Sequence, residues 1–368
     1  MIKVLHFVSS LSVSSGLMSV VMNYYRHIDR SKVQFGFMFF KKITEGSYEE
    51  EIKKLGGDCF FVDKPFFSKK YIKYIKTFFD NYCTEYSVFH LHELYLTRIL
   101  LKALNRERFK MVIGHAHTTK FSDKLISSIR NHLLWIGSSK EFDVRLACSK
   151  DAGKSYFGNK PFKVLYNAVD IEKYRYSDES RYRIRKEFNI NESTVVIGNV
   201  GRLCKQKNQS FLIKIFKFFK TKHIDSKLLI VGDGPLQKKL KKLAQKENVI
   251  EDTIFAGKRD DIGSLYSAMD IFVFPSLFEG LGIVLVEAQI NGLACLASSI
   301  VPIEAKIIPS LNFLSLKKRP SIWANVLSTQ RISDIDMYVV NSKYDIDSQS
   351  KCLEKIYLLK NNDMGVLL

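Results

Sequence analysis

The sequence predicts an α/β protein built from two doubly wound domains. Its 368 residues exceed one ordinary domain, short apolar runs alternate with longer amphipathic segments, and this pattern restarts about halfway along the chain. Strand–helix alternation favours parallel sheets with right-handed crossovers and helices on both faces. Hydrophobic residues make up 46% of the chain, which is enough for each domain to bury its own core.

In the first half, seven apolar runs are expected to form strands and four amphipathic segments to form helices. The first run is better explained as a buried strand than as a signal peptide, because His6 interrupts it and no small-residue cleavage site follows. The expected strands are 3–8, 33–40, 58–62, 88–91, 110–114, 145–148 and 163–165, and the expected helices are 17–28, 47–55, 69–82 and 123–135.

The second half repeats the alternation after a charged, polar stretch, 170–193, which we interpret as the linker. The expected strands are 195–200, 227–231, 253–255, 271–274, 293–297 and 313–316, and the expected helices are 209–221, 236–247 and 283–290. One more amphipathic helix is expected at 348–360. The resulting domains are 1–168, 169–345 and a C-terminal helix within 346–368 that could pack back on the first domain.

The composition limits the cellular setting more than the function. A net charge of +19 attracts polyanions in general, or reflects a solvated basic surface. The six cysteines form no CxxC pair, so neither a zinc site nor a disulfide framework is indicated, and a reducing cytoplasm is expected. No run of 18 uncharged apolar residues occurs, so no transmembrane helix is expected.

The most informative segment is 275–289, which reads PSLFEGLGIVLVEAQ and follows an expected strand. In an open parallel sheet, ligands bind beyond the carboxyl ends of the strands, and free N–H groups at a helix start suit a diphosphate. Gly280 and Gly282 would let the backbone approach it. Glu287, about a turn inside the helix, could accept both hydroxyls of a ribose. Alternatively, Glu279 is a loop carboxylate and Glu287 belongs to a buried ion pair.

A second cluster, GRLCKQKN at 201–208, again lies between an expected strand and a helix. Arg202 offers a planar fork of donors and Lys207 a mobile point charge, and both suit a diphosphate. The alternative is that both are ordinary surface residues.

Two further turns between a strand and a helix would also lie at the carboxyl ends of the strands. The segment 231–235, VGDGP, is a tight turn whose glycines allow positive φ, so Gly232 is mostly structural although it lies beside the site. In the first strand–helix turn, the small residues 14–16 would leave space for a phosphate or sugar at Gly16. No GxGxxG fingerprint occurs there, which counts against a dehydrogenase.

Two histidine pairs end expected strands, His90 with His92 and His115 with His117. Alternate residues of a strand share a face, so each pair points one way. Four histidines could indicate a metal, but no carboxylate or cysteine partner is evident. We expect no metal; instead, one histidine would contact a sugar and the others would line the site.

The stretch 64–76 interleaves lysines with aromatic residues. This is the composition of a helix that lies on an anionic membrane. An ordinary amphipathic helix with a basic outer face would have the same composition.

In their order and spacing, these segments resemble the large family of retaining glycosyltransferases with two Rossmann-like domains, known as family 4 of the GT-B fold. The resemblance runs over nearly the whole chain and is closest to bacterial capsule and exopolysaccharide members. It rests mainly on Glu279 and Glu287, separated by seven residues, and on the 201–208 and 231–235 segments. The segments NAVD at 167–170, FAG at 255–257, LYSAMD at 265–270 and HAH at 115–117 also match in place.

The resemblance implies the GT-B fold, two facing domains with a cleft between them, and a nucleotide-sugar bound mainly by the C-terminal domain. It also implies that Arg202 and Lys207 hold the diphosphate, that Glu287 holds the ribose and that Glu279 contacts the donor sugar. The implied catalytic residues are His117, Glu279, Arg202 and Lys207, and the implied donor-binding residues are Gly16, Arg202, Lys207, Gly232, Glu279, Gly280, Leu281, Gly282 and Glu287.

The predicted function is therefore a retaining hexosyltransferase that uses a nucleotide-sugar, with no cofactor and no metal. Its acceptor would be a glycan, carried on a polyprenyl diphosphate, in capsule, exopolysaccharide or O-antigen biosynthesis. The enzyme would be cytoplasmic and peripheral on the inner face of the cytoplasmic membrane, without nucleic acid as a partner. The alternatives are an NAD-dependent oxidoreductase and a non-catalytic polyanion-binding protein.

Overall fold

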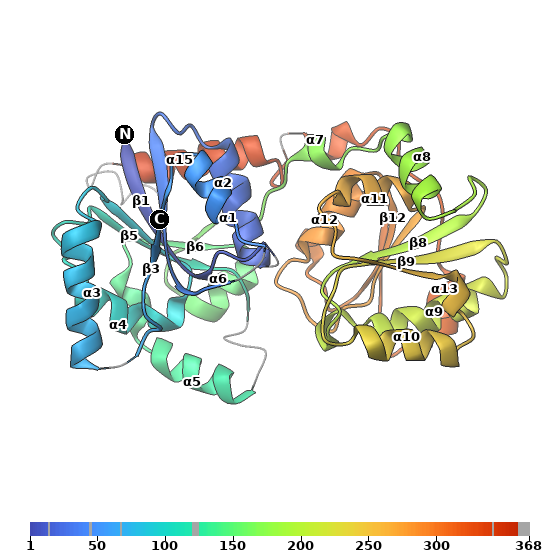
Figure 1. The fold of residues 1–368 in the computed structure, drawn as a ribbon, viewed down its shortest axis with the longest axis horizontal. Helices are drawn as coiled ribbons and strands as arrows, with labels where there is room; N and C mark the ends of the chain where they lie inside the picture. The colour runs from blue at the N-terminus through green and yellow to red at the C-terminus, as the bar shows by residue number, and fades with distance from the viewer. Residues whose placement is uncertain (14, 44–45, 67, 120–124, 341, 360–368) are drawn as a thin grey trace. The chain divides into compact units, whose positions relative to one another are not determined.

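The computed structural model divides the chain into two compact units, Met1–Val169 with Lys343–Leu368, and Asp170–Ser342 (Figure 1). It describes residues 1–13, 15–43, 46–66, 68–119, 125–340 and 342–359. The second unit therefore spans 170–342, whereas the domain limits expected from the sequence were 169 and 345.

The first unit contains a parallel seven-stranded sheet in the order β3-β2-β1-β4-β5-β6-β7. All seven expected strands are present. They are β1 (Ile2–Ser10), β2 (Val33–Lys41), β3 (Asp58–Phe61), β4 (Val88–Leu91), β5 (Met111–Ala116), β6 (Val144–Ala147) and β7 (Lys163–Val164). The central strands are almost wholly buried, as expected for a parallel sheet covered on both faces.

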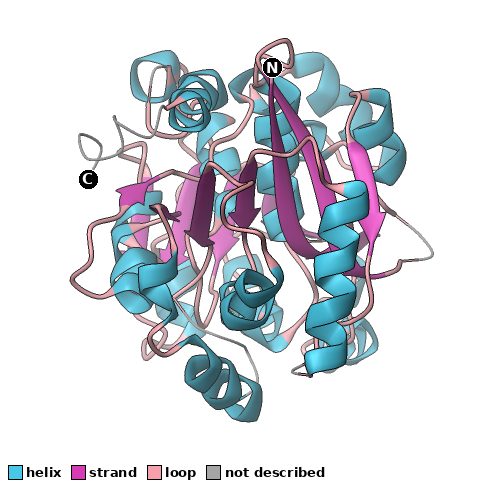
Figure 2. Cartoon of the chain, turned by 90° about the vertical axis from the view of Figure 1, so that its left-hand side faces the viewer, coloured by secondary structure: helices cyan, strands magenta, loops and turns pink. Residues whose placement is uncertain are grey.

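Helices cover both faces of this sheet (Figure 2). The helices are α1 (Gly16–His27), α2 (Glu49–Lys54), α3 (Lys69–Tyr82), α4 (Thr97–Ala103), α5 (Leu125–Trp135), α6 (Lys150–Phe157) and α15 (Ile346–Leu358), with short 3-10 turns η1 (Leu94–Leu96) and η2 (Ser138–Glu141). Buried residues of α3, α4 and α6, with Trp135 of α5, form one core. Those of α1, α2 and α15 form the core on the opposite face.

Serine caps fix where several of these helices begin. The hydroxyl of Ser15 accepts the Met18 N–H at 3.4 Å, and the hydroxyl of Ser68 accepts the Tyr71 N–H at 3.1 Å. Such a cap satisfies one of the N–H groups that a helix start leaves free. The caps therefore place the ends of the strand–helix loops.

The apolar side of α3 packs on the sheet, so part of the 64–76 stretch that was expected to face a membrane is buried. Tyr71, Ile75 and Phe79 recur every four residues and are buried in the core. Tyr71 therefore cannot insert into a bilayer, and Phe67 lies outside the described residues. The alternation of lysine and aromatic residues arose because α3 is amphipathic and packs on the sheet.

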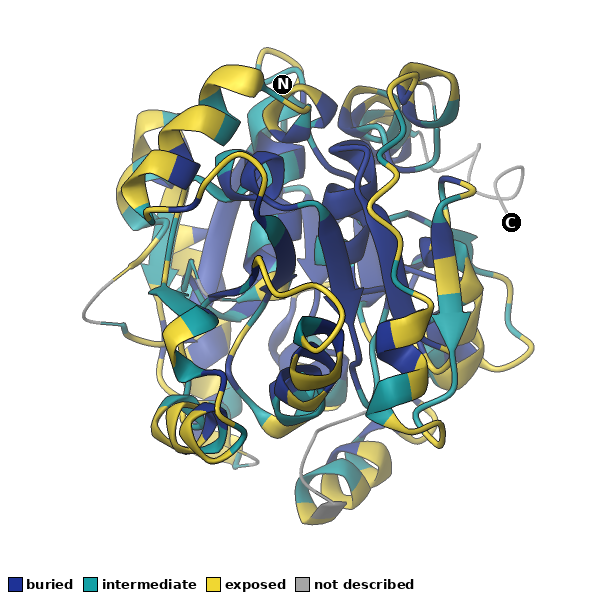
Figure 3. Ribbon diagram, turned by 90° about the vertical axis from the view of Figure 1, so that its right-hand side faces the viewer, coloured by how far each residue is buried: buried dark blue, intermediate teal, exposed yellow. Residues whose placement is uncertain are grey.

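The second unit contains a parallel six-stranded sheet in the order β10-β9-β8-β11-β12-β13. Its strands are β8 (Val195–Val200), β9 (Ser226–Val231), β10 (Thr253–Gly257), β11 (Ile271–Phe274), β12 (Ala294–Ser298) and β13 (Leu311–Leu314). Figure 3 shows these buried strands between helices with exposed outer faces. The last strand begins two residues earlier than predicted, because Leu311 is its buried position.

The helices of this unit again lie on both faces of the sheet. They are α7 (Ile171–Tyr174), α8 (Asp178–Glu187), α9 (Gln209–Lys220), α10 (Gln237–Lys246), α11 (Ile262–Ala268), α12 (Ile283–Ile290), α13 (Pro320–Asn325) and α14 (Asp336–Val339), with 3-10 turns η3 (Lys205–Lys207), η4 (Ile250–Asp252) and η5 (Ile303–Ala305). Residues of α9, α10 and α13 form one core with the strands.

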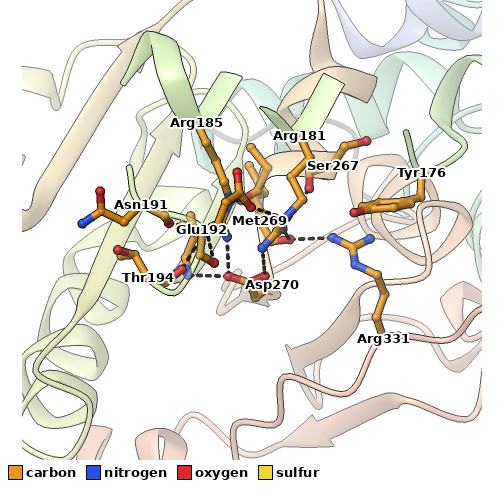
Figure 4. A network of polar contacts seen from close by, with 12 residues as sticks. Tyr176, Arg181, Arg185, Asn191, Glu192, Thr194, Ser267, Met269, Asp270 and Arg331 are labelled. Carbon is orange, nitrogen blue, oxygen red and sulfur yellow. Dashed lines mark hydrogen bonds and ion pairs between the residues drawn. The ribbon is translucent and has the colours of Figure 1, made fainter. Parts of the chain in front are cut away.

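The interpretation of 170–193 as a linker is wrong. The stretch forms α7 and α8, and a buried arginine anchors α8 to the sheet (Figure 4). Arg185 donates to Asp270 at 2.8 Å, and Asp270 also accepts from Arg181 at 3.0 Å. Arg185 further donates to the carbonyls of Asn191, Glu192, Thr194 and Ala268. The composition resembled a linker because α8 turns mostly charged residues to solvent.

Among the residues that the structure describes, none of the helices has the length and apolar composition needed to cross a bilayer.

Candidate active site

Two loops at the carboxyl edge of the second unit's sheet are held together by their backbones. The Leu203 N–H donates to the Asp233 carbonyl at 2.7 Å, and the Gly201 N–H donates to Val231 at 2.9 Å. Gly232 has φ +126°, and a Cβ there would lie 2.3 Å from the Gly201 oxygen. Glycine is thus required at 232 so that the 231–235 turn can pack against the 201–208 loop.

Lys207 and Glu279 meet at this edge. The Lys207 ammonium lies 2.8 Å from Glu279 Oε1 and 4.9 Å from the centre of the Phe274 ring. Both side chains are largely buried, with 16% and 6% of their surfaces exposed. The sequence predicted both residues as site residues, and the structure brings them into direct contact.

Two neighbours that the sequence analysis did not single out hold these loops in place. Gln206 donates to the Phe278 carbonyl at 3.0 Å and accepts the Leu277 N–H at 2.8 Å through its own carbonyl. Asn208 donates to the Pro275 carbonyl at 3.0 Å. Both lie within the 201–208 motif, but an amide's role in bracing another loop leaves no pattern in the sequence.

Arg202 stands on the same loop with its side chain exposed. Its backbone carbonyl accepts a hydrogen bond from the buried Gln209 side chain at 3.1 Å. Among the described residues its guanidinium has no hydrogen-bond or ion-pair partner. The loop backbone is therefore fixed while the cation stays available to a ligand.

The N-terminus of α12 faces the same edge. Gly282 is its N-cap with φ +81°, and no side chain caps the helix. A Cβ at 282 would lie 2.9 Å from the Phe274 ring, so glycine is needed for this approach. Of the preceding residues, Leu281 is buried and Gly280 is half-buried. The free N–H groups here form an anion-binding end.

Glu287 lies one turn into α12 and is buried. The Tyr266 hydroxyl lies 3.0 Å from Glu287 Oε2 and 3.0 Å from the Val284 carbonyl. Burial raises the pKa of the Glu287 carboxyl above its ordinary value, and hydrogen bonds from Tyr266 and Tyr174 partly oppose this. Within the part of the chain that the structure describes, Glu287 has hydroxyl partners and no ion pair, so its carboxylate is placed to accept hydroxyl donors.

His117 and Gly16 belong to the first unit. Gly16 is exposed at the start of α1, and a Cβ there would meet no atom within 4 Å. Among the described residues, no contact therefore requires glycine at this position. His117 directly follows β5 and is partly buried. Burial lowers the pKa of its imidazole to about 3, so His117 is neutral near pH 7.

His117 is one of five clustered histidines, and the sequence analysis missed one of them. His6 joins the two pairs because β1 lies beside β4, with His6 in register with His90. The groups His6, His90, His92 and His92, His115, His117 each bring their nitrogens within 4.8 Å, so each offers enough ligands for a metal. Burial lowers the pKa of all five imidazoles.

The second unit thus assembles cations, an uncapped helix start and two carboxylates at one sheet edge. Arg202, Lys207 and the α12 N-terminus can bind and stabilise a diphosphate. Glu287 can accept hydroxyl groups. This combination suits a nucleoside diphosphate and the departure of a group from it.

Comparison with known proteins identifies the family. The model of the family described as glycosyl transferases group 1 matches residues 180–314. The chain is 30% identical over 342 residues to the glycosyltransferase named EpsF of Bacillus subtilis (strain 168), which covers 89% of this chain and 87% of that protein. The chain belongs to the group 1 glycosyltransferases.

Another relative has a more specific name. The Escherichia coli UDP-Gal:alpha-D-GlcNAc-diphosphoundecaprenol alpha-1,3-galactosyltransferase is 30% identical over 199 residues, or 51% of each chain.

Solved structures show the same fold. A glycosyltransferase of Rickettsia africae ESF-5 aligns with a TM-score of 0.76 at 16% identity over 97% of each chain. Anabaena HepE in complex with UDP aligns with a TM-score of 0.72 at 17% identity, over 100% of this chain and 97% of that one. The prediction of a GT-B glycosyltransferase with two Rossmann-like domains is confirmed, and it replaces the oxidoreductase and polyanion-binding alternatives.

Proposed function

We propose that this glycosyltransferase moves a hexose or N-acetylhexosamine from a UDP-sugar to a glycan acceptor and retains the anomeric configuration. The observation that carries the proposal is the convergence of Arg202, Lys207 and the α12 N-terminus on one sheet edge of the second unit. The UDP complex of HepE supports a UDP-sugar donor. The diphosphoundecaprenol in the Escherichia coli relative's name supports a lipid-linked acceptor.

The cations act on the leaving group. As the bond between the anomeric carbon and the phosphate oxygen breaks, negative charge grows on the diphosphate. Arg202 and Lys207 stabilise that charge together with the N–H groups of α12, which is electrostatic catalysis by preorganised groups. Lys207 shifts from Glu279 toward the phosphate when the donor binds.

The carboxylates orient the donor. Glu287 accepts the ribose hydroxyls while Tyr266 holds its carboxylate in place. Glu279, with the backbone of 280–282, contacts the donor sugar. Neither carboxylate is proposed as a nucleophile.

Retention follows from attack on the face that the nucleotide leaves. The anomeric carbon passes through an oxocarbenium-like state, as in other glycosyl transfer. The acceptor oxygen forms the new bond to that carbon, and its proton goes to the departing phosphate oxygen. His117 contacts the reacting sugar.

The reaction is proposed to need no metal, because Arg202 and Lys207 supply the positive charge that a divalent cation would supply. No carboxylate pair accompanies these cations in a metal-ligating arrangement among the described residues.

The proposed pathway is capsule, exopolysaccharide or O-antigen biosynthesis, which the Escherichia coli relative named O-antigen biosynthesis glycosyltransferase WclY supports. The enzyme would work at the inner face of the cytoplasmic membrane. The exposed lysines of α3 would attract anionic lipid, at about 1 kcal/mol per basic residue near the surface. On the same face of the sheet, α5 exposes apolar residues along one side, namely Ile126, Ile129 and Leu133.

The test is a screen of the purified chain against a panel of UDP-, GDP- and TDP-sugars, NAD and oligonucleotides. We expect a thermal shift and slow hydrolysis with one UDP-sugar only. The anomeric proton of the product, observed by NMR, reports retention or inversion. A response to NAD alone, or an inverted product, would overturn the proposal.

A further inference from the structure

Three of the clustered imidazoles form a continuous hydrogen-bonded row. His6 Nδ1 lies 2.9 Å from His92 Nε2, and His92 Nδ1 lies 2.7 Å from His117 Nε2. The ring centres are 5.2 and 5.0 Å apart, with interplanar angles of 11° and 37°. Rings joined nitrogen to nitrogen at such centre distances lie edge to edge. The row runs from the middle of β1 to the residue just after β5.

A second row stacks on the first. The Tyr357 hydroxyl of α15 lies 2.7 Å from His90 Nδ1, and His90 Nε2 lies 3.3 Å from His115 Nδ1. His90 stacks on His92 at 4.3 Å between ring centres, and the His115 ring lies over the His117 ring at 3.9 Å with a tilt of 36°. The stacking fixes the plane of each ring.

This geometry favours hydrogen bonding over metal ligation. Imidazole lone pairs lie in the ring plane, so stacked rings direct them side by side instead of toward one point. Both nitrogens of His92 already contact another ring. A metal would have to break these contacts.

Each neutral imidazole has one N–H, and this restricts the row to two arrangements. If His6 donates to His92, then His92 donates to His117, and the proton of His117 must be on Nδ1. If the row runs the other way, His117 Nδ1 is bare and His6 carries its proton on Nε2. Among the described residues, the atoms of the row left without a partner are the same in both cases, His6 Nε2 and His117 Nδ1.

The surroundings of His6 decide between the two arrangements. Its ring lies 4.1 Å from the Phe35 ring and 5.4 Å from the Phe37 ring, deep in the core. Both atoms are buried, and a buried N–H without an acceptor is rare, so the N–H belongs where a ligand can supply the acceptor. The favoured arrangement therefore leaves a bare nitrogen at His6 and places the unsatisfied N–H on His117, which ends its strand at the ligand-binding edge of the sheet.

We propose that His92 and His6 are positioning residues that hold His117 in its Nδ1–H tautomer, so that His117 donates a hydrogen bond to a substrate oxygen. At that atom His117 is a donor and not a general base. The use of this donor rests on the proposed transfer reaction, whereas the tautomer does not depend on it.

The direct test is NMR of the full chain labelled with ¹⁵N-histidine, without ligand. We expect long-range ¹H–¹⁵N correlations that show His117 with a protonated Nδ1 and a bare Nε2, assigned from the signals missing in His117→Gln. Free histidine prefers the opposite tautomer. A protonated Nε2 on His117, or a stoichiometric change of these signals on adding Zn²⁺ alone, would overturn the proposal, the latter in favour of a metal site.

A variant pair links the tautomer to activity. His92→Phe keeps a planar ring but removes both hydrogen bonds of the row. It should release His117 to the Nε2–H tautomer and lower kcat roughly tenfold, as expected for one lost hydrogen bond. Tyr357→Phe removes one hydrogen bond of the second row only and should keep the His117 tautomer, with kcat within about twofold. Equal effects of the two variants on kcat and tautomer would indicate a packing role.

If His92→Phe does not fold, the NMR spectrum of the wild type still tests the tautomer of His117. If no UDP-sugar is turned over by the wild type, the proposed function fails while the tautomer assignment stands or falls on its own spectrum.

Discussion

Lys207 and Glu279 form an ion pair with a separation of 2.8 Å between two loops of the second unit. Each residue is largely buried, and each is proposed to contact the donor. The ion pair therefore compensates the charge of Lys207 before a diphosphate binds, and it holds the two loops together. Its removal should affect stability as well as activity.

Removing one partner leaves the other charge buried and unpaired. We expect Lys207→Met and Glu279→Gln each to lower the free energy of unfolding by about 3 kcal/mol or less, since breaking a fully buried pair costs about 3–5 kcal/mol. The double variant should lose less than the sum, with a coupling energy of about 0.5–3 kcal/mol. Urea denaturation of the four proteins measures this, and strictly additive losses would show that the two side chains do not interact.

Glu287→Gln and Arg202→Ala should lower turnover without unfolding the chain. Arg202 is exposed, and glutamine at 287 keeps the contact with Tyr266. Each change removes a charge-assisted contact worth about 1.5–3 kcal/mol, or roughly ten- to hundredfold in kcat/KM. Lys205→Ala, an exposed cation on the same loop as Arg202, is the matched control. Turnover like the wild type in either site variant would remove that residue from the site.

Much of the fold could be predicted because buried parallel strands are short apolar runs between amphipathic segments. The predictions failed where tertiary contacts dominate. Arg185 is fully buried, yet in sequence it is one more charge in a polar stretch. Charge-rich α8 depends on its contacts with Asp270, a residue 85 positions away, and no local pattern reports such a partner.

The candidate site was predictable to the extent that its residues lie in loops after strands. Parallel strands bring those loops to one edge, which is why Lys207 and Glu279 were expected together. His6 was missed because it lies inside a strand, and only the strand order brings it beside His90. Tyr266 was missed as a partner of Glu287 because its hydroxyl comes from the neighbouring helix α11.

Transfer activity should persist in EDTA. The reason is that Arg202 and Lys207 are proposed to neutralise the diphosphate in place of a divalent cation. The measurement is the initial rate with the UDP-sugar found in the screen, before and after dialysis against EDTA and after adding Mg²⁺ or Mn²⁺. A rate that disappears in EDTA and returns with the metal would mean that these cations do not suffice.

Acid should destabilise the first unit through its buried histidines. Burial lowers the pKa of His6 and His117 from 6.5 to about 3. The unfolded chain therefore takes up protons as the pH falls below about 6.5, whereas the folded chain does not until about 3. Stability falls with pH across this window, by up to about 1.4 kcal/mol per pH unit for each such histidine.

Urea denaturation between about pH 7 and pH 5 would measure this slope. His115→Phe should flatten it, because one buried imidazole is gone. His223→Ala, which removes an exposed histidine of the second unit, is the matched control. A stability that is constant over this range would contradict the neutral cluster.

Membrane binding should depend on the exposed lysines of α3, since Tyr71 is part of the core. We expect the chain to co-sediment with vesicles that contain anionic lipid and not with neutral vesicles. Changing the exposed residues Lys69, Lys70, Lys73 and Lys76 to Glu should abolish this binding. Salt should weaken it in the wild type, because exposed charges are screened over about 8–10 Å at moderate ionic strength.

The control for this experiment is an equal change of net charge elsewhere on the chain. Helix α10 of the second unit also carries four exposed lysines, Lys238, Lys239, Lys241 and Lys242. Changing these to Glu should leave most of the vesicle binding intact, because the proposed contact lies on the first unit. Equal loss in both variants would mean that net charge, not α3, drives binding. Unchanged binding of the α3 variant would rule out this surface, and no binding by the wild type would favour an acceptor that is not membrane-bound.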